Sequence, residues 1–282
     1  MNSLPADPWK RHARQWSYVG LPLRPGLEDA TFMHSAIAEW LRTTRRSAPT
    51  LLVLGVTPEL CKLQLSSGSR VIAVDKSADM IRSIWPGRLR TRDEVICADW
   101  RRLPLAASSI DLTLADGSLS ALAYPLEYSV VFSELQRLLR PQGRCVIRCY
   151  VQPDIRETPD EVFADLFRGR IGNFHVLKWR LAMALQSDAE GGVAVRSVWR
   201  TLQVAWKDLD LLAERFAWPI AEVLTIEAYR HVDTRYSFPT LAQYREFFSA
   251  AGFAVTQLAT PSYELGERCP TFVLEPLSSG PS

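Results

Sequence analysis

The 282-residue sequence has no long hydrophobic run, and this absence excludes one broad class of protein. No apolar stretch approaches the ~20 residues that a membrane-spanning helix needs. The first sixteen residues, MNSLPADPWKRHARQW, also lack the apolar core of a signal peptide. We therefore expect a cytoplasmic protein with no membrane partner.

The sequence also lacks an excess of charge of either sign and has no paired cysteine motif. Its 33 basic and 31 acidic residues leave a formal net charge of +2, too little for the positive field that attracts nucleic acid. An odd number of cysteines without C-x-x-C spacing argues against a disulfide framework and against a zinc site. The five cysteines are Cys61, Cys97, Cys145, Cys149 and Cys269. We expect neither a metal nor a nucleic-acid partner.

Short apolar runs, bounded by polar residues or glycine, recur through the first half of the chain. They occupy residues 50–55, 70–75, 94–98, 109–115 and 144–151. Runs of this length are typical of buried parallel strands, and helical periodicity between them, clearest over residues 126–140, indicates right-handed βαβ units. The sequence thus predicts an α/β fold, a doubly wound, Rossmann-like, mostly parallel sheet.

The pattern divides the chain into four parts. A lid and a leading helix occupy residues 1–49, and the α/β core occupies residues 50–151. Residues 152–238 contain helical patterns but few strands, which favours a helical insertion or cover. In residues 239–276, Thr240 and Gln243 form a predicted capping box, and two strands follow that complete the sheet as an antiparallel hairpin.

Polar residues follow the predicted strands, where an open α/β sheet binds its ligand. Asp75 ends the second strand, twenty residues after Gly55, the separation at which an acid can accept hydrogen bonds from a ribose. Asp99 and Trp100 follow the third strand, and Asp116 and Gly117 follow the fourth. The alternative is that each aspartate only caps the turn after it.

These segments resemble the class I S-adenosylmethionine-dependent methyltransferases. The resemblance covers most of residues 50–151 and again residues 240–275. It is carried by LLVLGVTPEL, VIAVDKSADMI, VICADWRRLPLAASSIDLTLADGSLSAL and VVFSELQRLLRPQGRCVIRCYV. The cofactor implied by the resemblance is S-adenosylmethionine.

The resemblance also implies roles for individual residues. It places Asp75 at the ribose hydroxyls, Asp99 at the adenine amino group, the backbone N–H of Trp100 at the adenine ring and Met80 on the adenine face. Lys76, beside Asp75, joins this predicted cofactor-binding set.

The first loop departs from the family pattern. Where the family has D-x-G-x-G-x-G, residues 53–59 read VLGVTPE, so the leading acid and two of three glycines are missing. Gly55 can still make the tight turn, but Thr57 and Glu59 bring side chains to the place where backbone normally approaches the ligand. Because the cofactor's amino group is cationic, Glu59 or Asp116 is predicted to replace the lost acid.

Methyl transfer needs mainly alignment of the nucleophile with the methyl group, so a general base is optional. The candidates in the insertion are His175 and His231, with Tyr124, Tyr229 or Tyr236 as hydroxyl partners. The alternative for each histidine is a structural or surface position.

The function predicted is methyl transfer from S-adenosylmethionine to a small-molecule acceptor. The insertion carries 11 basic and 13 acidic residues, a balance that favours a small, partly apolar substrate. Two alternatives remain open, a methyltransferase-like binding subunit without catalysis, favoured by the altered first loop, and a lyase or cyclase that uses the same cofactor. The sequence does not indicate the oligomeric state.

Overall fold

The computed structural model describes residues 8–277, and its centre is a seven-stranded mixed sheet. The first seven residues of the predicted N-terminal unit lie outside this range. In spatial order the strands are β3 (Glu94–Cys97), β2 (Arg70–Asp75), β1 (Thr50–Leu54), β4 (Ile110–Asp116), β5 (Leu139–Arg148), β9 (Thr271–Pro276) and β8 (Phe253–Ala259). The first five are mutually parallel, and β9 is antiparallel to both of its neighbours. The predicted fold class is confirmed.

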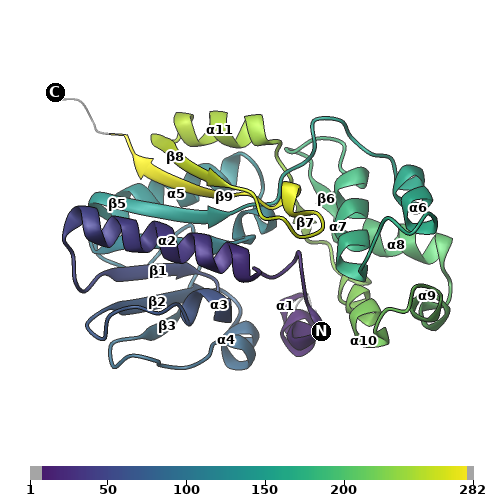
Figure 1. Cartoon of the computed structure of the whole chain (residues 1–282), viewed down its shortest axis with the longest axis horizontal. Helices are drawn as coiled ribbons and strands as arrows, with labels where there is room; N and C mark the ends of the chain where they lie inside the picture. The colour runs from purple at the N-terminus through teal and green to yellow at the C-terminus, as the bar shows by residue number, and fades with distance from the viewer. Residues whose placement is uncertain (1–7, 278–282) are drawn as a thin grey trace, which may run out of the picture.

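Helices cover both faces of the sheet, which explains why the central strands are mostly apolar on both faces. On one face lie α2 (Leu27–Thr44), α3 (Pro58–Cys61) and α4 (Ala78–Ile84). The other face is covered by α5 (Leu126–Leu138) and α11 (Leu241–Ala250). Figure 1 shows α2 in front of the sheet and α5 behind it. The capping box predicted for α11 is confirmed, because Thr240 Oγ1 accepts from the N–H of Gln243 and Thr240 N–H donates to Gln243 Oε1.

The boundary between α5 and β5 differs from the sequence prediction. The periodicity extends a helix to Arg140, but α5 ends at Leu138 and β5 begins at Leu139. Residues 140–143 interrupt the pairing of β5 with β4: Ile110 pairs with Leu139, but Leu112 pairs with Arg144. Pro141 cannot continue the helical hydrogen-bond pattern, so the chain extends directly into the strand.

Residues 152–238 form a second, mainly helical part with its own hydrophobic core. Its helices are α6 (Pro159–Phe167), α7 (Phe174–Leu185), α8 (Val195–Ala205), α9 (Leu209–Phe216), α10 (Ile220–Val223) and the 3₁₀ helix η3 (Leu224–Tyr229). A small antiparallel pair, β6 (Val193–Ala194) and β7 (Arg235–Tyr236), joins them.

The N-terminal helix α1 (Pro8–Gln15) lies between the sheet and this helical part (Figure 1). Arg11 donates to the carbonyl of Glu227, and Gln15 donates to the carbonyl of Leu224, so α1 is attached to η3. Of the helices in residues 8–277, none combines the length and the apolar character needed to cross a bilayer.

Phe132 lies at the centre of the aromatic cluster between the sheet and α5. It is fully buried, and its ring contacts Phe247, Phe248 and Phe253. We expect Phe132→Ala to lower the free energy of unfolding by about 3 to 5 kcal/mol, because it removes a large buried ring and leaves a cavity. The matched control is Leu126→Ala on the same helix, where the side chain is 76% exposed and the loss should stay within about 0.5 kcal/mol. Equal losses in urea denaturation would contradict this packing.

Candidate active site

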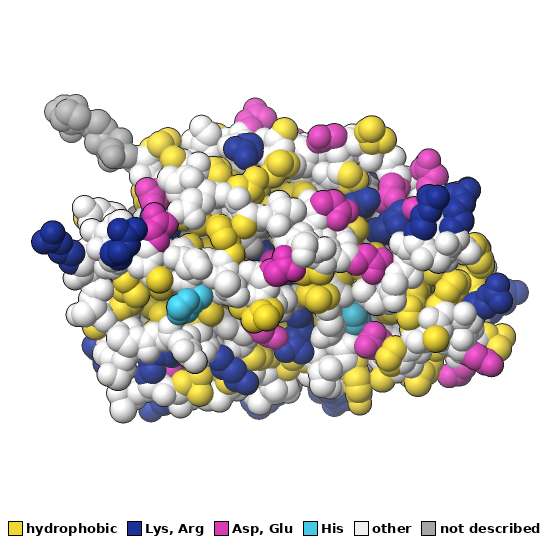
Figure 2. All heavy atoms as spheres, in the orientation of Figure 1, with side chains coloured by type: hydrophobic (Ala, Val, Ile, Leu, Met, Phe, Trp, Pro, Cys, Tyr) yellow, Lys and Arg dark blue, Asp and Glu magenta, His cyan; other side chains and the backbone are white. Residues whose placement is uncertain are grey.

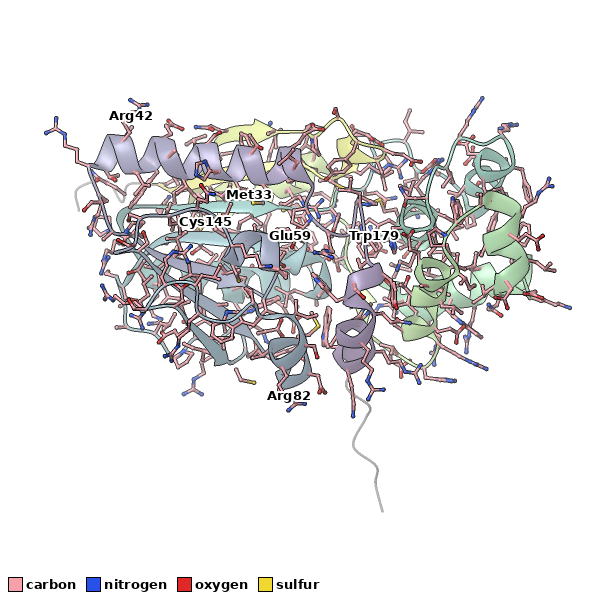
Figure 3. The ribbon with its side chains drawn as sticks, turned by 60° about the horizontal axis from the view of Figure 1, so that its bottom comes forward. Met33, Arg42, Glu59, Arg82, Cys145 and Trp179 are labelled. Carbon is pink, nitrogen blue, oxygen red and sulfur yellow. The ribbon has the colours of Figure 1, made fainter. Side chains whose placement is uncertain are left out.

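A single cavity runs from the carboxyl ends of the parallel strands to the facing surface of the helical part. The sheet contributes the residues after β1, β2, β3 and β4, and the helical part contributes Lys178, Trp179, Tyr229 and Tyr236. The N-terminal segment contributes Trp9, His12, Trp16, Val19 and Leu23. In Figure 3, Trp179 lies on the side of the helical part that faces the sheet. The cavity therefore has a sheet half and an aromatic half.

The turns after β1 and β4 bring backbone close to the sheet half. Gly55 has a φ of +109° and Gly117 a φ of +61°, conformations that favour glycine. A Cβ atom on Gly117 would lie 2.4 Å from the ring of Tyr150. Ser118 Oγ donates to the carbonyl of Leu54 over 2.7 Å, which links the two turns. Tyr150 thus forms a wall shared by both halves of the cavity.

Asp75, Lys76 and Met80, all predicted to bind the cofactor, line the sheet half. The carboxylate of Asp75 accepts from the backbone N–H of Ser77 over 2.8 Å, and Ser77 in turn caps α4. Asp75 therefore caps the turn that follows β2, as the alternative interpretation expected. A carboxylate has about four acceptor sites, so the same side chain can still accept from a ribose.

Asp99 and Trp100 also line the cavity after β3, together with Arg101. Arg101 donates to both carboxylate oxygens of Asp99, and these hydrogen bonds hold the pKa of Asp99 below its ordinary value. The indole of Trp100 donates to the carbonyl of Val74 over 2.7 Å, and the N–H of Gly55 donates to the same oxygen over 2.8 Å. The loops after β1 and β3 are therefore connected through β2.

Asp116 lies at the end of β4 and is paired with Arg148 at the end of β5. Arg148 Nε lies 2.5 Å from Asp116 Oδ1, and both side chains are almost fully buried. Burial would lower the pKa of Arg148, but the carboxylate of Asp116 reverses this effect and holds it above its ordinary value. Arg148 also donates to the carbonyl of Pro22 and to the hydroxyl of Tyr263. The ion pair thus joins the sheet to the N-terminal segment.

Glu59, one of the two acids predicted to bind the amino group, already has a partner. It is not among the residues that line the cavity, and it accepts from Arg24 Nε over 2.9 Å. Figure 3 shows Glu59 on the short helix α3. Thr57, buried at the start of α3, does line the cavity.

The aromatic half is lined by rings that contact one another. Tyr150 packs edge-to-face on Trp179 with ring centroids 5.0 Å apart, and Trp179 packs on Tyr236 at 5.5 Å. His12 contacts Tyr229 at 5.7 Å from the opposite side. Such walls suit a planar, partly apolar molecule.

Lys178 is a buried lysine in this half that sequence reasoning missed. Its Nζ donates to Thr225 Oγ1 over 3.0 Å and lies 5.4 Å from the ring centroid of Tyr229 and 5.8 Å from that of Phe174. Burial lowers the pKa of Lys178 to about 7, with Glu222 acting in the opposite direction. No carboxylate in the described part of the chain lies within ion-pair distance of Nζ. The sequence feature that could have indicated it is a lysine within a mostly apolar helix, α7, whose sequence is FHVLKWRLAMAL.

The two histidines predicted as catalytic do not line the cavity. His175 is buried on α7, and its Nε2 lies 2.9 Å from the carbonyl of Tyr18. Burial and the neighbouring Lys178 lower the pKa of His175 to about 3, so this ring fixes the N-terminal segment as a neutral donor. His231 is exposed in a separate surface hollow with three arginines. Tyr124 packs on Tyr128 outside the cavity.

Removing Arg148 should strongly destabilise the fold. Arg148→Met leaves Asp116 buried without its partner, which typically costs about 3 to 5 kcal/mol of the free energy of unfolding. Adding Asp116→Asn should restore part of the loss, because no buried charge then remains. Arg82→Met, at a site 70% exposed and labelled in Figure 3, is the control and should change little. Urea denaturation measures all four proteins, and a loss below about 1 kcal/mol for Arg148→Met would contradict this role.

Lys178 should make stability depend on pH. Its folded pKa of about 7 lies below the value of about 10.4 for an unfolded lysine, so between these values the unfolded chain binds a proton that the folded chain lacks. The free energy of unfolding then rises with pH, by about 1.4 kcal/mol per pH unit. We expect Lys178→Met to stabilise the protein most at neutral pH and progressively less toward about pH 10. Urea denaturation across this pH range measures the effect, with Lys62→Met, at an exposed lysine, as control. A gain in the free energy of unfolding of Lys178→Met that did not depend on pH would refute the prediction.

Comparison with known proteins agrees with this geometry. Residues 54–147 match the family model described as a methyltransferase domain. A malonyl-[acyl-carrier protein] O-methyltransferase from Methylovorus sp. is 34% identical over 82 residues. The matched region covers 27% of this chain and only 27% of that relative's length.

Solved structures show the same fold at low sequence identity. A Methanosarcina mazei S-adenosylmethionine-dependent methyltransferase is 16% identical, with a TM-score of 0.51 over 86% of this chain and 97% of that one. A Rhodobacter sphaeroides protein described as a zinc-dependent alcohol dehydrogenase is 12% identical, with a TM-score of 0.60 over 98% of this chain and 100% of that one. Residues 54–147 therefore form a methyltransferase domain of the S-adenosylmethionine-dependent type.

Proposed function

We propose that this protein transfers the methyl group of S-adenosylmethionine to a small-molecule acceptor held in the aromatic half of the cavity. The observation that carries the proposal is the continuity of the cavity, since Tyr150 borders both the turn at Gly117 and the ring of Trp179. A methyl donor on the sheet side and an acceptor on the aromatic side would meet at this residue.

The sheet half fits S-adenosylmethionine by the chemistry of its residues. Asp75 offers acceptors for ribose hydroxyls, and Met80 offers an apolar surface for the adenine ring. Asp116 keeps acceptor sites beyond the one used by Arg148 and faces the cavity, which suits the cationic amino group of the cofactor. The cofactor supplies an electrophilic methyl group on a sulfonium sulfur.

The residues of the chain then align the acceptor with the methyl group, enclose both molecules and exclude water from them. Positioning supplies most of the rate of such a transfer, because the nucleophile must approach along the line of the bond that breaks. Trp9, Trp16 and Leu23 come from the N-terminal segment and cover the cavity, and the bond from Arg148 to Pro22 holds this segment in place. Exclusion of water strengthens the polar contacts inside.

A small acceptor is favoured over a macromolecule by enclosure and by charge. The aromatic half is bounded by two parts of the chain that meet around it, so a bulky substrate would have to displace α1. The face in Figure 2 mixes acidic, basic and hydrophobic side chains without a field of one sign. A nucleic acid would need a continuous basic surface.

Calorimetry with S-adenosylhomocysteine tests the proposal. We expect Asp75→Ala to weaken binding by about 1.5 to 3 kcal/mol, roughly 10- to 150-fold, because a charged hydrogen bond to the ribose is lost. Asp79→Ala, four residues away and outside the cavity, is the control and should bind normally. Wild-type protein that binds neither S-adenosylmethionine nor S-adenosylhomocysteine at millimolar concentration would overturn the proposed function.

The same titration separates the two candidate acids. Asp116→Asn should weaken binding of the cofactor's amino group, whereas Glu59→Gln should have a smaller effect, because Glu59 lies outside the cavity. Each variant is first checked for cooperative unfolding, since Asp116→Asn also leaves Arg148 without its counter-ion. Equal affinities for wild type and Asp116→Asn would contradict the role proposed for Asp116.

A further inference from the structure

Lys178 occupies a place where a charge is costly and an acceptor would lie. It comes from α7, is 2% exposed and lines the aromatic half of the cavity. The cations on the sheet side, Lys76 and Arg101, follow β2 and β3 and belong to the other half. A neutral amine has two N–H donors and one lone pair, and the structure gives Nζ one hydrogen bond, which it donates to Thr225. The lone pair and one donor of Lys178 therefore remain for a ligand.

The titratable groups around Lys178 do not neutralise it. His12 on α1 and His175 on α7 both have pKa values lowered to about 3 by burial and by Lys178, so both are neutral near pH 7. Burial holds the pKa of Tyr229 well above its ordinary value and raises that of Tyr236 to about 12. Glu222 on α10 acts on Lys178 without forming an ion pair. In the described residues no carboxylate forms an ion pair with Lys178, so once Lys178 has taken up a proton its positive charge would be balanced by the bound acceptor.

We propose that Lys178 accepts the proton of an acidic hydroxyl on the acceptor, a phenol or an enol, and then pairs with the oxyanion. This inference rests on the proposed function. The aromatic walls formed by Trp179, Tyr229 and Tyr236 select a planar conjugated molecule, and the buried amine selects an acidic oxygen over a basic nitrogen.

The step balances in atoms and charge. The neutral amine of Lys178 takes the O–H proton, and the oxygen forms a bond to the methyl carbon while the carbon–sulfur bond breaks. The electron pair of that bond goes to sulfur, giving S-adenosylhomocysteine and a methyl ether. Lys178 then loses its proton to water when the product leaves. A base whose pKa lies near the working pH suits this role.

The experiment uses 4-nitrophenol as the probe, because its phenolate absorbs visible light and its phenol does not. Full-length protein loaded with S-adenosylhomocysteine is titrated with the dye at a pH below that at which the free dye ionises. We expect the bound dye to appear as the phenolate in wild type, and 4-nitroanisole, which has no acidic proton, to bind more weakly. This readout uses wild-type protein and does not depend on the folding of a variant.

The matched variants are Lys178→Met and Lys62→Met, a buried and an exposed lysine. Lys178→Met should bind the dye at least about tenfold more weakly and leave it protonated, while Lys62→Met behaves as wild type. The proposal is overturned if the dye does not bind the loaded wild type, binds as the phenol, or is ionised equally by Lys178→Met. Binding of S-adenosylhomocysteine, measured first, reports separately on the proposed function.

Discussion

The buried ion pair between Asp116 and Arg148 determines how the cavity is built. An arginine keeps its charge in any protein environment, so burying it at the end of β5 requires a full set of acceptors. One is the carboxylate at the end of β4, and another is the carbonyl of Pro22 in the N-terminal segment. This requirement brings the N-terminal segment, more than a hundred residues away in sequence, onto the strand ends, where it covers the cavity.

Much of the fold could be predicted from the sequence because its determinants are local. Buried parallel strands need continuous apolar runs, and the ligand edge of such a sheet needs polar residues at the strand ends, so Asp75, Asp99 and Asp116 were found by position alone. The structure brings these three to one cavity with Gly55 and Gly117. Their binding roles remain predictions, since the geometry gives their location and their present partners.

Tyr229 and Tyr236, predicted as hydroxyl partners, do line the aromatic half, but most of this half could not be predicted because its contacts are not local. Lys178 meets Thr225 across 47 residues, and His175 meets Tyr18 across 157. A histidine attracts a catalytic interpretation from its ordinary pKa, but burial beside a lysine makes His175 a neutral structural donor. The ion pair of Glu59 with Arg24 could not be predicted for a similar reason, because Arg24 lies outside the first loop and no spacing rule connects the two residues.

A crystal structure with S-adenosylhomocysteine tests most directly whether the altered first loop still leaves a working cofactor site. We expect the ribose at Asp75, the adenine ring against Met80 and the amino group at Asp116, with the sulfur directed past Tyr150 toward the aromatic half. A ligand bound elsewhere, or a sheet half filled by the side chains of Thr57 and its neighbours with the ligand excluded, would contradict it.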